Sequence, residues 1–465
     1  MIELSHVHFR YAEMESESLK GISLKLARGK CLVLSGSSGS GKTTVTRLIN
    51  GLIPHFYPGE LSGSIKIKGE DIRGRQAHEL AMQIASVFQN PRTQFFNTDT
   101  DSELVFAMEN CAIPSEEMQL RYGRTVADLH LEHLSGRDIF SLSGGEKQWI
   151  AFGSDHALEP ELFVLDEPSA NLDHVSIERL REILLHLKQK GKTILIAEHR
   201  LYYLRDIADQ LAWLEDGRLE TLFDISELRS KSCEELHALG LRTLAAPISF
   251  RMPVSCPTQT PALELRALTV SRGKQRILTE LNLLADYGQI VGVTGANGSG
   301  KSTLAKTICG LMTEENGSIY FDGQILPPRA RKDVAFLVMQ DPNYQLFGDS
   351  VENELRLSAY RDPPDENRIE DLLTQLDLNK LRTRHPLSLS GGQKQRLCIA
   401  LAALSPASVL IFDEPSSGLD FDNMRRITEL LKALSKQQRA ILVISHDQEF
   451  LQMVCTQIVS LHEKQ

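Results

Sequence analysis

Two glycine-rich segments of this 465-residue chain carry the residue types needed to hold a triphosphate. They occupy residues 36–44 and 295–303, and each fits the pattern G-x-x-x-x-G-K-[ST]. Glycines allow successive backbone N–H groups to face a phosphate, the following helix N-terminus adds partial positive charge, and the lysine reaches the outer phosphates. Each segment follows an apolar run, which supplies the strand that such a loop requires. The sequence therefore predicts two nucleotide sites.

The same set of residues is expected to contact the nucleotide in each loop. In the first loop these are Gly36, Ser37, Gly39, Ser40, Gly41, Lys42, Thr43 and Thr44. In the second loop they are Gly295, Asn297, Gly298, Ser299, Gly300, Lys301, Ser302 and Thr303. We expect the hydroxyls of Thr43 and Ser302 to bind Mg²⁺, which prefers oxygen ligands and keeps several waters.

The same further motifs follow both loops at matched distances. LSGGE begins at Leu142 and LSGGQ begins at Leu389, and each is followed by an apolar run that ends in Asp-Glu-Pro. The LSGG serine precedes the aspartate by 23 residues in both copies, as Ser143 to Asp166 and Ser390 to Asp413. The glutamate precedes a histidine by 32 residues in both copies, as Glu167 to His199 and Glu414 to His446. Equal spacing over this length indicates a duplicated domain of about 200 residues.

These motifs, in this order, resemble those of ATP-binding cassette (ABC) ATPases, with two cassettes fused in one polypeptide. The resemblance covers nearly the whole chain, and LSGG between a P-loop and an Asp-Glu strand is highly specific to that family. It implies an α/β fold with two tandem P-loop NTPase domains, each with a mainly parallel buried sheet and a helical subdomain that carries LSGG. It also implies hydrolysis of ATP to ADP and phosphate.

The resemblance assigns a role to each further motif. The metal-side carboxylates would be Asp166 and Asp413, and the groups that orient or deprotonate the attacking water would be Glu167 and Glu414. The switch histidines that bond the γ-phosphate would be His199 and His446, and the glutamine-loop residues that touch the metal would be Gln89 and Gln340. The LSGG residues Ser143, Gly144, Gly145, Ser390, Gly391 and Gly392 would form a second anion seat, which completes the ATP site of the other domain.

The two copies differ at the position expected to stack on adenine. Tyr11 resembles the stacking aromatic in the first copy, whereas Arg272 takes that place in the second. A guanidinium also stacks on a planar base, but it leaves base affinity at the second site open. Because both glutamates and both histidines are present, we expect two hydrolytically competent sites that need not be equal.

A pattern Q-x-P-x-x-Q-apolar-Phe follows a short apolar segment in both copies, from Gln89 and from Gln340. It resembles the glutamine loop of energy-coupling factor (ECF) transporter ATPases, and the fused duplication resembles their double-cassette form. This implies an importer of vitamins, micronutrients or metal ions, with a transmembrane scaffold protein and a small substrate-binding membrane protein as partners. Nearby acidic residues are candidates to receive arginines of the scaffold, namely Asp99, Asp101, Glu103, Asp349, Glu352 and Glu354.

Three other functions could use two such cassettes. A conventional two-cassette importer ATPase, for example for sugars, differs only in its membrane partner. A soluble ABC translation factor typically has a long charged helical linker between its cassettes, whereas the linker in this chain is short and proline-rich. A DNA-repair ABC ATPase would need a long coiled-coil insertion, for which this length leaves no room.

The elements that position these motifs are short apolar runs of four to five residues. They occupy 31–34, 162–165 and 193–197 in the first copy, and 290–293, 409–412 and 440–444 in the second. Such runs, alternating with helical patterns, favour parallel strands buried on both faces. Residues 225–241 have a helix-like pattern, and four prolines follow. We expect a first domain at 1–245, a proline-rich linker at 246–261 and a second domain at 262–465.

Composition excludes several classes of protein. A net charge of −10 gives no support for a broad nucleic-acid surface. The seven cysteines include no CxxC pair, so they predict neither a disulfide framework nor a zinc site. The most apolar stretch, 397–412, is shorter than a membrane span and is interrupted by Ser405 and Pro406, which predicts a helix end, a turn and a buried strand. We therefore expect a soluble, cytosolic protein, and the resemblance to ECF transporter ATPases implies that it lies peripherally on the cytoplasmic face of the membrane.

Overall fold

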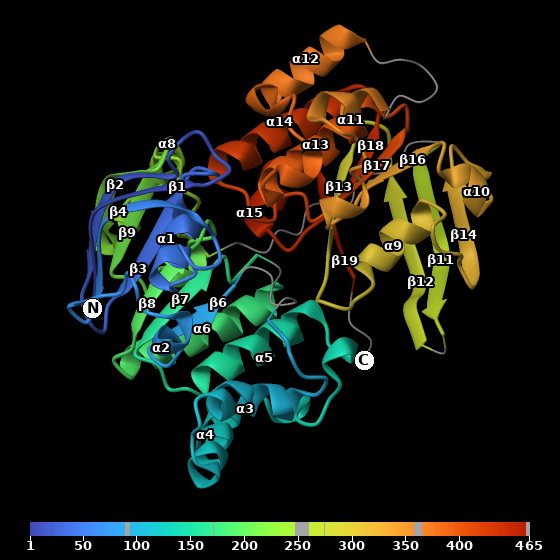
Figure 1. Cartoon of the computed structure of the whole chain (residues 1–465). Helices are drawn as coiled ribbons and strands as arrows, with labels where there is room; N and C mark the ends of the chain where they lie inside the picture. Colours follow the sequence, from blue (N-terminus) through green and yellow to red (C-terminus); the bar gives the residue numbers. More distant parts are fainter. Residues whose placement is uncertain (89–93, 171, 247–259, 274, 358–364, 462–465) are drawn as a thin grey trace. The chain divides into compact units, whose positions relative to one another are not determined.

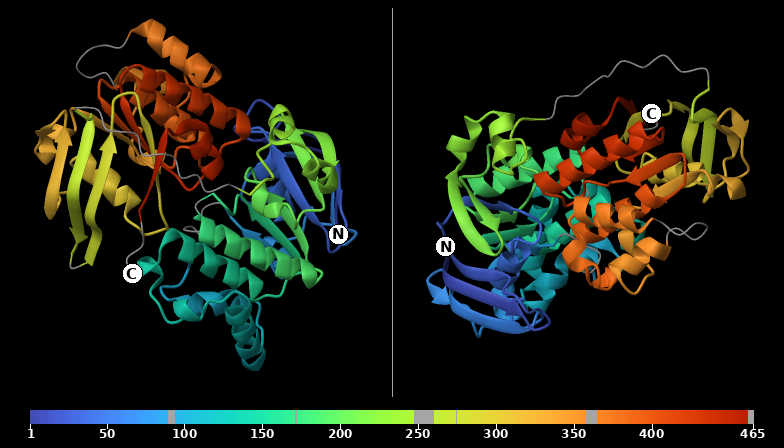
Figure 2. Two further views of the ribbon diagram at one scale, coloured as in Figure 1. Left: turned by 180° about the vertical axis from the view of Figure 1, so that it is seen from behind. Right: turned by 90° about the horizontal axis from the view of Figure 1, so that it is seen from above.

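The structure is a computed structural model that describes all residues except 89–93, 171, 247–259, 274, 358–364 and 462–465. The chain divides into two compact units, Met1–Ala246 and Pro247–Gln465, which we call the first and the second unit (Figure 1). Each unit has a mainly parallel central sheet, a small antiparallel sheet on one side and helices on the other (Figure 2).

Five strands of the central sheet have the same order in both units, and the first sheet also has β10 at its edge. In the first unit the order is β10-β9-β3-β8-β7-β6, and only the β9–β10 pair is antiparallel. In the second unit the order is β16-β17-β18-β13-β19, with parallel pairs throughout. The strands of the first sheet are β3 (Cys31–Gly36), β6 (Ile84–Val87), β7 (Leu162–Asp166), β8 (Thr193–Ala197), β9 (Gln210–Glu215) and β10 (Arg218–Asp224). Those of the second are β13 (Ile290–Thr294), β16 (Ala335–Val338), β17 (Val409–Asp413), β18 (Ala440–Ile444) and β19 (Gln457–Ser460).

Each antiparallel sheet has four strands, in the orders β2-β1-β4-β5 and β12-β11-β14-β15. The first comprises β1 (Ile2–Tyr11), β2 (Leu19–Leu26), β4 (Gly59–Ile67) and β5 (Glu70–Asp71). The second comprises β11 (Leu263–Arg272), β12 (Gln275–Ala285), β14 (Asn316–Phe321) and β15 (Gln324–Ile325).

The helices α1 to α6 of the first unit correspond in order to α9 to α14 of the second. Those of the first unit are α1 (Lys42–Ile49), α2 (Ala77–Ala81), α3 (Thr100–Asn110), α4 (Ser115–Asp128), α5 (Gly144–His156), α6 (His174–Gln189), α7 (Ile225–Arg229) and α8 (Cys233–Ala238). Those of the second are α9 (Lys301–Ile308), α10 (Pro328–Arg331), α11 (Val351–Leu357), α12 (Glu366–Gln375), α13 (Gly391–Leu404), α14 (Phe421–Lys436) and α15 (Gln448–Val454). Single 3₁₀ turns are η2 (Glu132–Leu134), η3 (Ile139–Ser141), η4 (Tyr202–Leu204), η5 (Pro342–Tyr344), η6 (Asn379–Leu381) and η7 (Pro386–Ser388).

The central strands are buried on both faces, as their continuous apolar runs predict. Along β7, Leu162 and Val164 pack toward the antiparallel sheet, while Phe163 and Leu165 pack toward the helices. The six apolar runs identified in the sequence are β3, β7, β8, β13, β17 and β18. The prediction of two tandem α/β units with mainly parallel buried sheets is confirmed.

Two local predictions had different outcomes. Residues 397–412 form the end of α13, a turn at Ser405 and the buried strand β17, as expected. Residues 225–241, which have a helix-like pattern in the sequence, form two short helices, α7 and α8. The break follows from Ser232, whose side chain accepts a hydrogen bond from the Glu235 N–H and begins a new helix. In the described part of the chain, no helix is both long and apolar enough to cross a bilayer.

Candidate nucleotide sites

Each P-loop joins the end of a central strand to a helix. β3 leads through Gly41 into α1, and β13 leads through Gly300 into α9. Both glycines have a left-handed backbone, with φ of 97° and 96°. A Cβ atom at these positions would lie 2.6 Å from the Leu19 side chain and 2.8 Å from the Leu278 side chain. Glycine is therefore required by both the backbone and the packing at the start of each helix.

The P-loop lysines turn back over their own loops. Lys42 Nζ donates to the carbonyl oxygens of Gly36 at 3.0 Å and Ser37 at 2.9 Å. Lys301 Nζ donates to those of Gly295 at 2.8 Å and Ala296 at 2.7 Å. Both lysine side chains are buried, so each ammonium group lies in the concave side of a glycine-rich loop, where a phosphate group would gain most from its charge.

Each loop also contains a buried hydroxyl at the same position. Within the described part of the chain, Ser40 Oγ and Ser299 Oγ have no hydrogen-bond partner. A buried hydroxyl without a partner costs about 1–3 kcal/mol. Its recurrence in both loops suits a ligand that supplies the missing acceptor, such as a phosphate oxygen.

The predicted metal ligands come together in both units. Thr43 Oγ1 donates to Asp166 Oδ1 at 3.2 Å, and Ser302 Oγ donates to Asp413 Oδ2 at 2.7 Å. Burial raises the pKa of both aspartates, and these hydrogen bonds partly oppose that shift. Hydroxyl and carboxylate oxygens side by side are the hard ligands that Mg²⁺ prefers, so these residues fit the ion.

Of the two predicted glutamine-loop residues, only Gln340 lies among the described residues. Gln340 is exposed and lies two residues after the end of β16, while Gln89 lies outside the described residues. No cluster of three or more His, Cys, Asp or Glu side chains able to hold a metal occurs among the described residues. A metal at these sites would therefore depend on the hydroxyl and carboxylate pairs, the nucleotide and water.

Tyr11 ends β1 and lies against the first turn of α1. Its hydroxyl contacts Thr44 Oγ1 at 3.2 Å and accepts a hydrogen bond from Arg47 at 3.0 Å. The Arg47 guanidinium also lies 4.1 Å from the ring centroid of Tyr57. The first unit thus fixes an aromatic ring beside its P-loop helix, which suits stacking on a base. In the second unit Arg272 ends the equivalent strand β11 and is exposed.

The predicted catalytic glutamates occupy identical strained corners. Glu167 and Glu414 directly follow β7 and β17, with φ of 47° and 53°. Their backbone N–H groups donate to Ala197 and to Ile444, each at 2.8 Å. A non-glycine residue in this conformation costs about 1 kcal/mol or more, and such strain is concentrated at functional sites.

Each predicted switch histidine lies beside the glutamate of its own unit. His199 Nε2 is 3.8 Å from Glu167 Oε1, and His446 Nε2 is 3.7 Å from Glu414 Oε1. All four side chains are largely buried. Two residues 32 positions apart in sequence are therefore brought together twice with the same geometry, which suits a shared role at a reacting phosphate.

The LSGG serines begin helices in both units. Ser143 caps α5 and Ser390 caps α13, each in a reciprocal capping box with the residue three positions later. A Cβ atom at Gly144 or Gly391 would meet nothing within 4 Å, so the fold of each unit does not require glycine there. Glycine at an exposed helix start leaves backbone N–H groups open to an anion. That each serine serves the nucleotide held by the other unit stays a prediction.

The helix α5 is tied to β6 by Asp155, whose Oδ2 accepts a hydrogen bond from the Ser86 N–H at 3.1 Å. Burial raises the pKa of Asp155 to about 7. The neutral form of Asp155 is therefore favoured in the folded protein. Its contribution to the free energy of unfolding is fully present below the ordinary pKa near 4 and is lost as the pH rises through 7.

We expect Asp155→Asn to stabilise the first unit at pH 8 by about 1–2 kcal/mol and to have little effect near pH 4. The partial exposure of Asp155 keeps the gain below the full linkage value. The chain has two tryptophans, Trp149 and Trp213, and both lie in the first unit, so denaturant titration followed by tryptophan fluorescence reports on that unit. The exposed Glu234→Gln is the control, and equal stability of Asp155→Asn and wild type at pH 8 would contradict the assignment.

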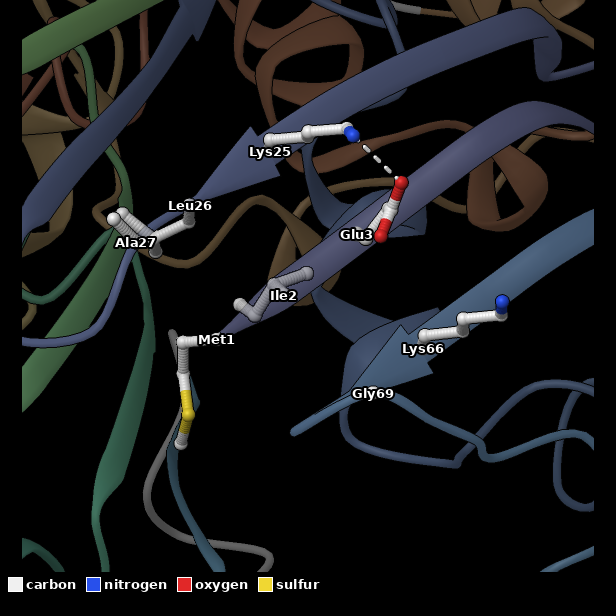
Figure 3. Close-up of a pocket in the computed structure, with 8 residues that line it drawn as sticks. All are labelled: Met1, Ile2, Glu3, Lys25, Leu26, Ala27, Lys66 and Gly69. Carbon is white, nitrogen blue, oxygen red and sulfur yellow. Dashed lines mark ion pairs between the residues drawn. The ribbon is translucent and has the colours of Figure 1, made fainter.

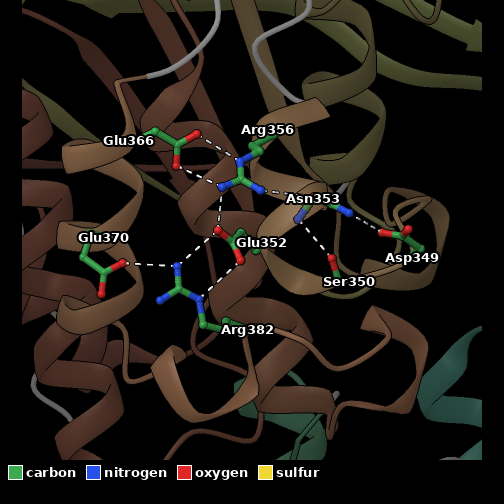
Figure 4. A network of polar contacts seen from close by, with 8 residues as sticks. All are labelled: Asp349, Ser350, Glu352, Asn353, Arg356, Glu366, Glu370 and Arg382. Carbon is green, nitrogen blue, oxygen red and sulfur yellow. Dashed lines mark hydrogen bonds and ion pairs between the residues drawn. The ribbon is translucent and has the colours of Figure 1, made fainter.

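The acidic residues expected to receive a partner's arginines are engaged within their own units. Asp99 caps α3, and Asp101 accepts a hydrogen bond from the Tyr122 hydroxyl at 2.8 Å. Glu352 pairs with Arg356 and Arg382 in a network that joins α11, α12 and η6 (Figure 4). The remaining acids in that group are Asp349, which accepts from Asn353, and the buried Glu103 and Glu354.

Glu103 and Glu354 have a shared structural task that sequence reasoning missed. Glu103 Oε2 accepts from the backbone N–H groups of Phe96 at 3.1 Å and Asn97 at 2.8 Å. Glu354 Oε2 accepts from those of Phe347 at 2.7 Å and Gly348 at 2.6 Å. The signal was the same seven-residue spacing from phenylalanine to glutamate in both copies.

A shallow pocket in the first unit is separate from these sites (Figure 3). It lies at the end of β2 opposite to Leu19, which packs beside the P-loop, and its polar residues include the ion pair of Glu3 with Lys25 at 2.8 Å. Because no P-loop residue lines this pocket, we assign it no part in nucleotide binding.

Comparison with known proteins agrees with this geometry. Residues 19–170 and 278–417 match the ABC transporter family. A Treponema denticola protein, provisionally named an ABC transporter ATP-binding protein, is 45% identical over 99% of this chain and 95% of its own. A Bacillus subtilis protein, provisionally named HMP/thiamine import ATP-binding protein YkoD, is 29% identical over 100% of this chain and 90% of its own. Among solved structures, the archaeal ribosome recycling factor aABCE1 shares the fold over 98% of this chain and 87% of its own, with a TM-score of 0.67 and 21% identity.

Proposed function

This chain belongs to the ABC transporter family and is an ATPase, and on that premise we propose that it is the energising subunit of an ECF-type membrane importer. Its cargo would be a vitamin, a micronutrient or a metal ion. It would act peripherally on the cytoplasmic face of the membrane, with a transmembrane scaffold protein and a small substrate-binding membrane protein. The name of the Bacillus subtilis relative, which refers to import of HMP and thiamine, supports this class of cargo.

The observation that carries the proposal is a matched pair of exposed phenylalanines. Phe96 is 75% exposed and Phe347 is 81% exposed, and each ends the Q-x-P-x-x-Q-apolar-Phe pattern of its unit. Covering one such side chain contributes about 1.5–3 kcal/mol. An aromatic residue exposed at the same place in both units is an anchor for a partner protein.

The backbone N–H groups of these phenylalanines have acceptors within their own units. The carboxylates of Glu103 and Glu354 hold the phenylalanine N–H groups, as described above. The second glutamine of each pattern folds back on the central sheet, where Gln94 Nε2 donates to Ser86 O at 3.1 Å and Gln345 Nε2 donates to Leu337 O at 2.6 Å. A preformed anchor loses less conformational entropy on binding than a flexible one.

Within each unit, the chain's own residues divide the predicted work at the nucleotide. We infer that the P-loop and its lysine bind and orient the triphosphate, and that Mg²⁺ is held by Thr43 with Asp166 and by Ser302 with Asp413. Mg²⁺ would supply charge neutralisation at the phosphates. Glu167 and Glu414 would accept the proton of the attacking water, and His199 and His446 would hold the outer phosphate.

The test is co-purification with a scaffold protein encoded beside this gene. We expect wild-type chain to be recovered with the membrane scaffold, and Phe96→Ser with Phe347→Ser to reduce recovery at least about 10-fold, because two buried aromatic contacts are lost. ATP turnover by the isolated variant should stay within about twofold of wild type. Phe56→Ser, which alters another exposed phenylalanine of the first unit, is the matched control.

Retention of scaffold binding by the double serine variant would contradict the role given to these phenylalanines. Failure of the wild-type chain to bind any such scaffold would contradict the importer itself. Co-sedimentation with ribosomes instead would favour the translation-factor alternative, and docking on a two-protein sugar permease would favour the conventional importer.

A further inference from the structure

The residue before the predicted switch histidine differs in charge between the two units. It is Glu198 in the first unit and Ser445 in the second. Two further positions change with it, because Arg200 corresponds to Asp447 and Tyr203 corresponds to Phe450. All six residues are buried. Three coordinated replacements around one histidine indicate that the two units hold it in different ways.

In the second unit the predicted catalytic glutamate itself holds the histidine segment. The backbone N–H of His446 donates to Glu414 Oε1 at 3.2 Å. The Ser445 hydroxyl donates to Glu414 Oε2 at 3.1 Å. The Glu414 carboxylate, which we infer accepts a proton from water, therefore already accepts hydrogen bonds from the segment that carries His446.

In the first unit Glu198 takes over this structural task. Its Oε1 accepts from the backbone N–H groups of His199 at 2.8 Å and Arg200 at 3.0 Å. Its Oε2 accepts from the Tyr203 hydroxyl at 2.9 Å and from the Ser169 N–H at 3.3 Å. The histidine N–H that goes to the catalytic glutamate in the second unit thus goes to a separate carboxylate in the first.

Arg200 completes the arrangement. Its Nη1 donates to the Ser169 carbonyl oxygen at 3.2 Å, so the N–H and C=O of Ser169 are both held by residues that flank His199. Ser169 lies two residues after Glu167. In the second unit, the contact at this place joins the hydroxyls of Ser416 and Ser445 at 3.4 Å.

We propose that Glu198 is a positioning residue that fixes His199 and the Ser169 segment beside Glu167, a task that falls to Glu414 and Ser445 in the second unit. The inference rests on the proposed function of Glu167 and His199 and deepens it. It makes the first site the faster of two unequal ATPase sites.

The replacements occur together because a buried carboxylate needs donors on every side. Burial raises the pKa of Tyr203 well above its ordinary value, so its hydroxyl stays protonated and donates to Glu198. Phe450, at the corresponding position of the second unit, has no hydroxyl to donate. Ser445 has no carboxylate that would require such a donor. A buried charge with four donated hydrogen bonds holds its neighbours more rigidly than a serine hydroxyl does.

The experiment measures each site alone in the full chain. Glu414→Gln silences the second site, and Glu198→Ser with Tyr203→Phe is then added, so that no buried tyrosine hydroxyl is left without its acceptor. We expect kcat for ATP to fall about 10-fold with KM changed less than about twofold, because orientation is lost and binding is kept. Glu198→Gln, which retains an oxygen acceptor for the His199 N–H, should keep kcat within about threefold.

The reciprocal exchange separates positioning from a merely structural role. With the first site silenced by Glu167→Gln, the triple variant Ser445→Glu, Asp447→Arg and Phe450→Tyr should raise kcat of the second site several-fold. Tryptophan fluorescence verifies that the first-unit variants are folded, and thermal unfolding followed by circular dichroism, with binding of a fluorescent ATP analogue, verifies the second-unit variants.

Two results would overturn the inference: unchanged kcat in the Glu198→Ser, Tyr203→Phe variant, or a loss confined to KM. If the double variant Glu167→Gln, Glu414→Gln retains full turnover, the proposed roles of the glutamates fail instead. The two failures are therefore distinguishable.

Discussion

Replacing both P-loop lysines, as Lys42→Ala with Lys301→Ala, is expected to reduce ATP turnover at least about 100-fold and to weaken nucleotide binding strongly. Each ammonium group lies inside its loop and donates to two loop carbonyls, so it is already placed where the triphosphate charge would gather. Without it, the charge of the outer phosphates is left to the backbone N–H groups alone. Phosphate release and titration with a fluorescent ATP analogue measure the two effects.

The control for the lysine experiment is Lys25→Ala, an exposed lysine at the far end of β2 from the P-loop. It changes net charge by the same amount per substitution and should leave both measurements unchanged. Because the lysines are buried, thermal unfolding of the double variant must also be recorded. Full turnover by a folded double variant would remove the basis for placing ATP at these loops.

The second large effect is expected from the glutamates that follow β7 and β17. Glu167→Gln and Glu414→Gln should each remove hydrolysis at one site, and the double variant should reduce turnover by about 10²–10⁴-fold. Glutamine keeps the size and the hydrogen-bonding oxygen but cannot accept a proton from water. Nucleotide binding should therefore remain while hydrolysis is lost, which the lysine variants would not show.

Steady-state phosphate release from the two single variants gives the share of each site. The exposed Glu116→Gln serves as the matched control, since it makes the same chemical change on α4. Full activity in either single variant would refute the prediction of two competent sites. A first site that is faster than the second is the result that the arrangement around Glu198 leads us to expect.

Much of the fold could be predicted because the decisive information is local in sequence. Apolar runs of four to five residues become strands buried on both faces, and the glycine loops must lie between a strand and a helix. The spacing of Glu167 to His199, repeated in Glu414 to His446, indicated the duplication that the two units show. Equal intervals in two copies constrain three-dimensional position in a way that one copy does not.

What could not be predicted depends on burial. The sequence shows that Glu103 and Glu354 are charged, and the interpretation as docking groups assumed that they face solvent. Both instead accept backbone hydrogen bonds inside their units, because the loop after β6 and after β16 brings N–H groups that need acceptors into the interior. The structural task of Glu198 could not be predicted either, since its partners Tyr203 and Ser169 lie in two other segments.

Helix continuity was the other limit of the sequence. Residues 225–241 have a helical pattern of apolar residues, yet a serine that can cap a new helix interrupts it. Both short helices still bury their apolar side chains against the first unit, among them Leu228 and Leu236. The apolar spacing indicated helical structure in this segment, while a single capping residue decided where the chain changes direction.

The left-handed backbone at Glu167 and Glu414 has an evolutionary consequence. Glycine adopts these angles without the cost of about 1 kcal/mol that a glutamate meets there, and one nucleotide change converts a glutamate codon to a glycine codon. If selection for ATP turnover at one site relaxes, replacement of the glutamate by glycine relieves backbone strain and so does not destabilise the fold at this position. We expect relatives with glycine at one of these positions to be folded chains in which one of the two ATP sites no longer hydrolyses nucleotide.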